Sequence, residues 1–125
     1  MNVNDYLEHV YLGPQPPCWQ LVSEVYMAEL GQTVKEFRTI NNSVRSIASA
    51  FRIALHKGAH GFEQVAAPAD FAVVLLGKSV EIGLHHCGIW FDGKLLHALE
   101  SGNYYEEMSA IGDRYALVEH WAKAP

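Results

Sequence analysis

Two apolar stretches, GLHHCGIWF and KLLHALE, are separated only by the dipeptide Asp92-Gly93. Asp-Gly between such stretches is the typical signal of a two-residue β-hairpin turn, because both turn positions require a positive φ. This turn also sets the register, since the numbers of directly opposed residues then sum to about 185. The sequence therefore predicts that His97 lies opposite Gly88, which makes His86 and His97 diagonal neighbours on one face of the hairpin.

The other elements follow from apolar spacing and turn residues. Helices are predicted over residues 4–12, 18–30 and 43–57, and further strands over residues 62–65, 70–76 and 115–121. The segment ESGNYYEE, residues 100–107, is acidic and aromatic and is predicted to be a solvated loop. Helices followed by an antiparallel meander indicate an α+β fold, and 125 residues indicate a single domain spanning 1–125.

Composition argues against several classes of protein. The net charge of −5 leaves no basic stripe for phosphates, so we expect no nucleic-acid partner. No apolar run approaches the length of a membrane span, and we expect no membrane insertion. The first residues, MNVNDYLEHVYLG, lack the basic and apolar regions of a signal peptide. Two cysteines do not make a disulfide framework.

Cys18 has an unusual position, directly behind Pro17 at the start of an apolar run with helical spacing. Proline suits the first turn of a helix, where the backbone N–H has no partner in any case. The unpaired N–H groups and the helix dipole at that end stabilise an anion, and therefore a thiolate. Because the thiolate is the nucleophilic form of cysteine, the sequence predicts Cys18 as a catalytic nucleophile.

A cysteine nucleophile needs a base, and the predicted hairpin supplies two histidines. His86 is the candidate base, and His97 is placed to hold it in the correct tautomer. The neighbours of His86, His85 and Cys87, point to the opposite face of the strand and are predicted to be structural.

The same residues also allow other interpretations. A buried cysteine is often only a small apolar side chain, and a strand histidine is often structural. Alternatively, Cys18, His86, His97 and a fourth ligand form a zinc site, although the usual ligand spacings such as Cys-x-x-Cys are absent. Our main prediction includes no metal and no cofactor.

The ordered motifs of the chain resemble those of the NlpC family of papain-like cell-wall cysteine peptidases, in particular its phage-tail branch. The stretch PCWQLVSEVYMAELG is similar to the segment around the family's nucleophile, which reads Asp-Cys-Trp-Gly-Leu-Val. QVAAPADFAVVLL is similar to the family's valine–proline–Gly-Asp segment that leads into an apolar strand, and HCGIWFDGKLLHALESG is similar to its histidine strand and the His-Ala that follows the turn. The resemblance extends from about residue 6 to residue 121 and implies a papain-like fold with the nucleophile at a helix N-terminus, packed on an antiparallel sheet.

Individual roles follow from this resemblance. Cys18 matches the nucleophile, His86 the general base and His97 the residue that orients the base. Tyr11 matches a tyrosine that contacts the substrate carbonyl, and the backbone N–H of Cys18 supplies an oxyanion donor. The chain departs from the family pattern at positions that bear on substrate specificity, namely Pro17, Gln20 and Ala69.

By the same resemblance, the expected activity is that of an endopeptidase cutting peptidoglycan stem peptides between D-glutamate and the diamino acid. The expected location is the tail tip of a phage or prophage, with other tail-tip proteins as partners. Such a protein is made in the host cytoplasm and delivered by the virion to the periplasm or cell wall. The alternatives are a structural tail-tip or tail-assembly protein that keeps the fold with a silent or residual active site, and a thiol hydrolase acting on another amide, thioester or lipid ester.

Overall fold

Helices precede the sheet in the computed structural model, which describes residues 1–37 and 39–124. The helical elements, in chain order, are α1 (Asn4–Leu7), α2 (Pro17–Val25), the π-helix η1 (Tyr26–Leu30), α3 (Val44–His56), the 3₁₀-helix η2 (Ala59–Gly61) and α4 (Met108–Gly112). The predictions of helices over 18–30 and 43–57 are confirmed. The predicted helix over 4–12 is wrong beyond its first turn, because α1 ends at Leu7 with Glu8 as its C-cap.

Local chemistry explains where the two longer helices begin. Pro17 occupies the first turn of α2, where no intrahelical N–H is lost. The Ser43 side chain caps α3 by accepting a hydrogen bond from the Ser46 backbone N–H at 3.2 Å. Gly31, with φ of 62°, ends η1 in the left-handed conformation that glycine adopts without strain.

Six antiparallel strands form one sheet in the order β1-β6-β2-β3-β4-β5. Their bounds are β1 (Phe62–Val65), β2 (Val73–Gly77), β3 (His86–Phe91), β4 (Lys94–Leu99), β5 (Gly102–Glu107) and β6 (Leu117–Lys123). Only β2 to β5 form the predicted meander, because β6 returns across the sheet and inserts between β1 and β2. The predicted loop over 100–107 is wrong, since β5 pairs along the whole of β4 and thereby satisfies its backbone.

The predicted hairpin and its register are confirmed. Ile89 lies opposite Leu96, so the numbers of paired residues sum to 185 as expected. Asp92 and Gly93 both have positive φ, at 49° and 81°, which is the requirement of the two-residue turn.

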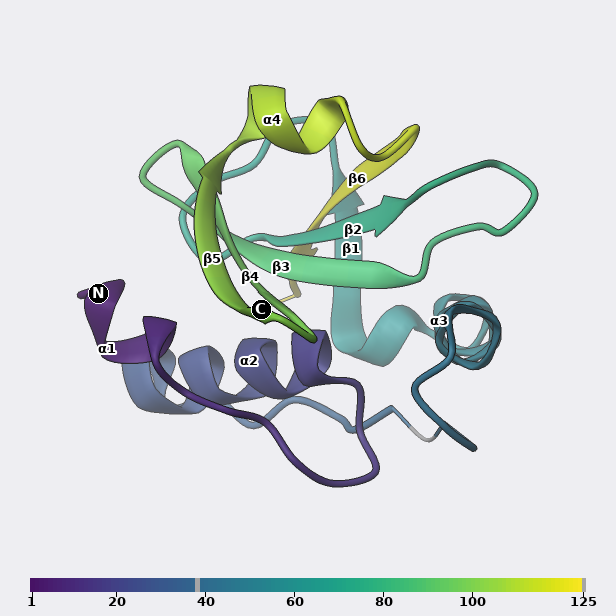
Figure 1. The fold of residues 1–125 in the computed structure, drawn as a ribbon, viewed down its shortest axis with the longest axis horizontal. Helices are drawn as coiled ribbons and strands as arrows, with labels where there is room; N and C mark the ends of the chain where they lie inside the picture. Colours follow the sequence, from purple (N-terminus) through teal and green to yellow (C-terminus); the bar gives the residue numbers. More distant parts are fainter. Residues whose placement is uncertain (38, 125) are drawn as a thin grey trace.

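Strands β2 to β4 are mostly buried, and α2 and α4 lie on opposite sides of the sheet (Figure 1). One face packs on α2, in a core that includes Leu21, Val25, Ile89 and Leu96. A smaller cluster on the other face lies beneath α4 and includes Val74, Leu76, Leu95, Ile111 and Tyr115. These layers give an α+β fold. The first turn of α2 lies beside the N-terminal end of the central strand β3. None of the helices within 1–37 and 39–124 combines the length and apolar character needed to cross a membrane.

Candidate active site

Cys18 lies in the first turn of α2 and is almost fully buried, with 3% of its surface exposed. It nevertheless contributes to the wall of an open pocket of about 590 Å³. Pro17 has no N–H, and the N–H groups of Trp19 and Gln20 both donate to the Pro16 carbonyl at 3.0 Å, so the helix dipole is what places positive partial charge at this end of α2. The position favours an anion on Cys18, as the sequence predicts.

The pocket is walled by five parts of the chain. These are the start of α2, the start of α3, the segment before and at the start of β3, the end of β4 with the turn after it, and the connection between α4 and β6. The lining side chains include Cys18, Val44, Ile47, Lys78, His85, His86, Glu100 and Tyr115. Cys18 and His86 therefore face the same solvent-accessible space.

His86 and His97 are in direct contact, as the hairpin register predicts. The Nε2 atom of His86 lies 2.8 Å from the Nδ1 atom of His97, and both side chains are buried. Gly88, one residue beyond the Ile89–Leu96 pair, lies close to the backbone of β4 next to His97. A Cβ atom at Gly88 would lie 2.7 Å from the Leu96 backbone oxygen and 2.9 Å from the His97 Cβ.

Beyond His97 lie two charged residues that the sequence reasoning missed. The His97 Nε2 atom is 2.6 Å from a carboxylate oxygen of Glu106, on β5. Arg114, which follows α4, donates to both oxygens of the same carboxylate, at 3.1 and 2.6 Å. Burial is the main cause that lowers the pKa of His97 to about 4, and the Arg114 hydrogen bonds are the main cause that lowers the pKa of Glu106 to about 2. At neutral pH His97 is therefore neutral and Glu106 is a carboxylate.

Cys87, which the sequence predicts to be structural, lies next to Cys18. It points away from His86, as the alternation predicts, but that face of β3 is the one on which α2 packs, so Cys87 and Cys18 share one core. The Cys87 thiol, as a hydrogen-bond donor, is the largest cause that lowers the pKa of Cys18. Burial of the sulfur opposes this effect, and the His86 imidazole lowers the pKa further through hydrogen bonding and charge. Burial is the main cause that raises the pKa of Cys87 itself, so the site favours ionisation of Cys18 over ionisation of Cys87.

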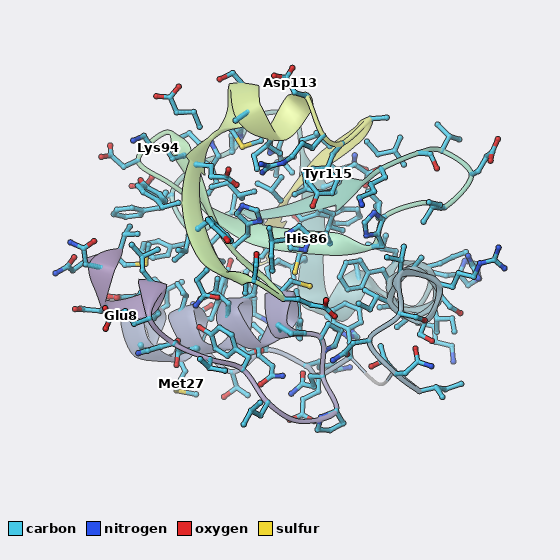
Figure 2. The ribbon with its side chains drawn as sticks, viewed as in Figure 1. Glu8, Met27, His86, Lys94, Asp113 and Tyr115 are labelled. Atoms are coloured by element: carbon cyan, nitrogen blue, oxygen red, sulfur yellow. The ribbon has the colours of Figure 1, made fainter. Side chains whose placement is uncertain are left out.

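Three further side chains bear on the site, those of Tyr115, His85 and Tyr11. Tyr115 lines the pocket and stacks on His86, with ring centroids 5.7 Å apart, and Figure 2 shows both side chains near the centre of the molecule. His85 also lines the pocket and accepts a hydrogen bond from the Lys78 backbone N–H at 3.1 Å. The role predicted for Tyr11 in substrate binding stays a prediction: its hydroxyl donates to Glu24 at 2.8 Å.

The chain was compared with family models, curated proteins and solved structures. No family model, no curated protein and no solved structure matches the chain. Among residues 1–37 and 39–124, there is no group of three or more His, Cys, Asp or Glu side chains that could hold a metal ion.

Proposed function

We propose that the protein is a cysteine peptidase with a papain-like, NlpC-type fold, in which Cys18 is the nucleophile, His86 the general base and His97 the residue that orients the base. The observation that carries this proposal is the position of His86, which shares a pocket with Cys18 on one side and contacts His97 at 2.8 Å on the other. An acidic thiol, an imidazole and a third group behind the imidazole are the parts that nucleophilic catalysis by cysteine requires.

The steps of hydrolysis follow from these positions. The Cys18 thiolate attacks the carbonyl carbon of an amide, and in this proposal the Cys18 backbone N–H stabilises the developing oxyanion. As the carbon–nitrogen bond breaks, the His86 imidazolium gives its proton to the leaving amine and a thioester forms on Cys18. Neutral His86 then takes a proton from water, whose oxygen attacks the thioester and releases the acid and the thiolate.

The proposed substrate is the peptidoglycan stem peptide, cut between D-glutamate and the diamino acid, and the proposed setting is the tail tip of a phage or prophage, among other tail-tip proteins. The motif resemblance supports this assignment. The pocket wall adds a second line of support, because it carries both an ammonium group, on Lys78, and a carboxylate, on Glu100. A stem peptide has carboxyl and amino groups to pair with both.

Digestion of purified sacculi tests this function. Wild-type protein and Cys18→Ala are incubated with sacculi under reducing conditions, and the soluble products are identified by mass spectrometry. We expect only the wild type to release muropeptide fragments with a new amino group on the diamino acid. Cleavage at another bond would identify a different thiol hydrolase, and no release by either protein would favour a structural tail component.

A further inference from the structure

Behind the two histidines, a carboxylate and a guanidinium extend the line of polar contacts to the surface. The order along this line is His86, His97, Glu106, Arg114, with the closest polar atoms of successive residues 2.8, 2.6 and 2.6 Å apart. His97 is fully buried, whereas Glu106 is partly exposed and Arg114 is about half exposed. The line therefore runs from solvent, at Arg114, through the fully buried His97 to His86 in the wall of the pocket.

The direction of the hydrogen bonds along this line is fixed by chemistry. A carboxylate can only accept, so the proton of neutral His97 must lie on Nε2, facing Glu106. The Nδ1 atom of His97 is then an acceptor, which requires His86 to donate from Nε2. The Nδ1 atom of His86 is left as the nitrogen that can take the proton of Cys18.

The titratable groups in contact with His97 lie on opposite sides of its ring. His86 lies on one side of the ring, Glu106 on the other, and the Tyr104 ring is 6.2 Å away between centroids. Arg114 donates from two N–H groups to both carboxylate oxygens of Glu106, which holds the carboxylate ionised and in one orientation.

We infer that Glu106 is a positioning residue that sets the tautomers of His97 and His86, and that Arg114 holds Glu106 in place for this role. The effect of Glu106 on hydrolysis rests on the proposed peptidase function, whereas the effect of Glu106 on the tautomer of His97 does not. Neither residue contacts the reacting atoms. Both act through the histidine pair.

The variant Glu106→Gln tests this inference with little change in shape. A glutamine side chain presents either its oxygen or its NH₂ group to His97 Nε2. When the NH₂ group faces the ring, the His97 proton moves to Nδ1, and His86 must then accept at Nε2 and carry its own proton on Nδ1. In that state His86 cannot take the proton of Cys18. Glu107→Gln, the same change at the exposed neighbouring residue, is the matched control.

The tautomer is read directly from the imidazole ¹⁵N chemical shifts of the labelled protein. We expect His97 to carry its proton on Nε2 in the wild type and in Glu107→Gln, and to populate both tautomers in Glu106→Gln. We also expect Glu106→Gln to slow alkylation of Cys18 at pH 7 by about tenfold and muropeptide hydrolysis by about 10- to 100-fold. Glu106→Asp, which keeps the carboxylate, is expected to restore a single tautomer.

Two results would overturn the inference: a Glu106→Gln protein that is folded and keeps the wild-type His97 tautomer, or one that alkylates at the wild-type rate. Arg114→Gln, at an exposed position that should tolerate substitution, provides the same test if Glu106→Gln fails to fold. It is expected to shift the alkylation rate in the same direction by a smaller factor. A wild-type protein that shows the expected tautomer but hydrolyses no muropeptide would contradict the proposed function and leave the positioning role intact.

Discussion

Replacing His86 with glutamine is expected to lower kcat/KM for hydrolysis by about a thousandfold. Glutamine has a similar size and keeps a donor that can reach the Nδ1 atom of His97, so the local packing should survive. It has no group that gains or loses a proton near neutral pH, and both steps of the reaction require such a group. Rates measured on a defined muropeptide give this value.

His56→Gln is the control for this change, because His56 is an exposed residue at the end of α3 and lies outside the pocket. It should keep the wild-type rate. The His86→Gln protein should also alkylate more slowly at Cys18 below neutral pH, since His86 contributes to the low pKa of that thiol. A His86→Gln enzyme within a factor of ten of the wild type would remove His86 from the proposed mechanism.

The second large effect is expected from Gly88→Ala, which should lower the free energy of unfolding by about 2 kcal/mol. The added methyl group would lie 2.7 Å from the Leu96 backbone oxygen and 2.8 Å from the Leu95 side chain, and a paired strand cannot yield cheaply. It would also press on the His97 Cβ, at 2.9 Å, and so displace the contact between the two histidines. Urea unfolding followed by circular dichroism measures the loss.

Gly112→Ala separates this packing effect from the general effect of replacing glycine. A Cβ atom at Gly112 would meet nothing within 4 Å, and the residue lies in α4, so alanine should leave stability unchanged or raise it slightly. Equal urea midpoints for Gly88→Ala and the wild type would show that the hairpin has room for a methyl group at this position. That result would contradict the close approach of Gly88 to β4.

The histidine pair could be predicted from the sequence because a two-residue turn allows one register only. Once Asp92 and Gly93 form that turn, the pairing of Ile89 with Leu96 follows by counting, and continuing the count makes His86 a diagonal neighbour of His97. The start of α2 could be predicted for a similar reason, since Pro17 restricts where a helix can begin. Both are local constraints that act within a few residues.

Glu106 and Arg114 could not be predicted in the same way. The connection between Leu99 and Gly102 carries no strong hairpin signal, so the register of β5 on β4 could not be counted. Without that register, Glu106 is one acid among several in a polar segment. Its alignment beside His97 depends on strand pairing, and Arg114 reaches it only because α4 turns the chain back.

Cys87 shows a different limit of sequence reasoning. Alternation along β3 correctly separates Cys87 from His86, but it does not say which face α2 will cover. Because α2 covers the face of Cys87 and begins beside His86, Cys18 meets both residues. The position of β6 between β1 and β2 was missed for the same reason, since it depends on tertiary packing.

The central claim is that Cys18 is an activated nucleophile, and the pH dependence of its alkylation by iodoacetamide in the folded wild-type protein tests it most directly. An ordinary thiol has a pKa of about 8.5. Labelling of Cys18, followed by peptide mass spectrometry, should be half-maximal well below neutral pH, while Cys87 stays unlabelled. A midpoint near that of an ordinary thiol, or a Cys18 that does not react in the folded protein, would contradict the account.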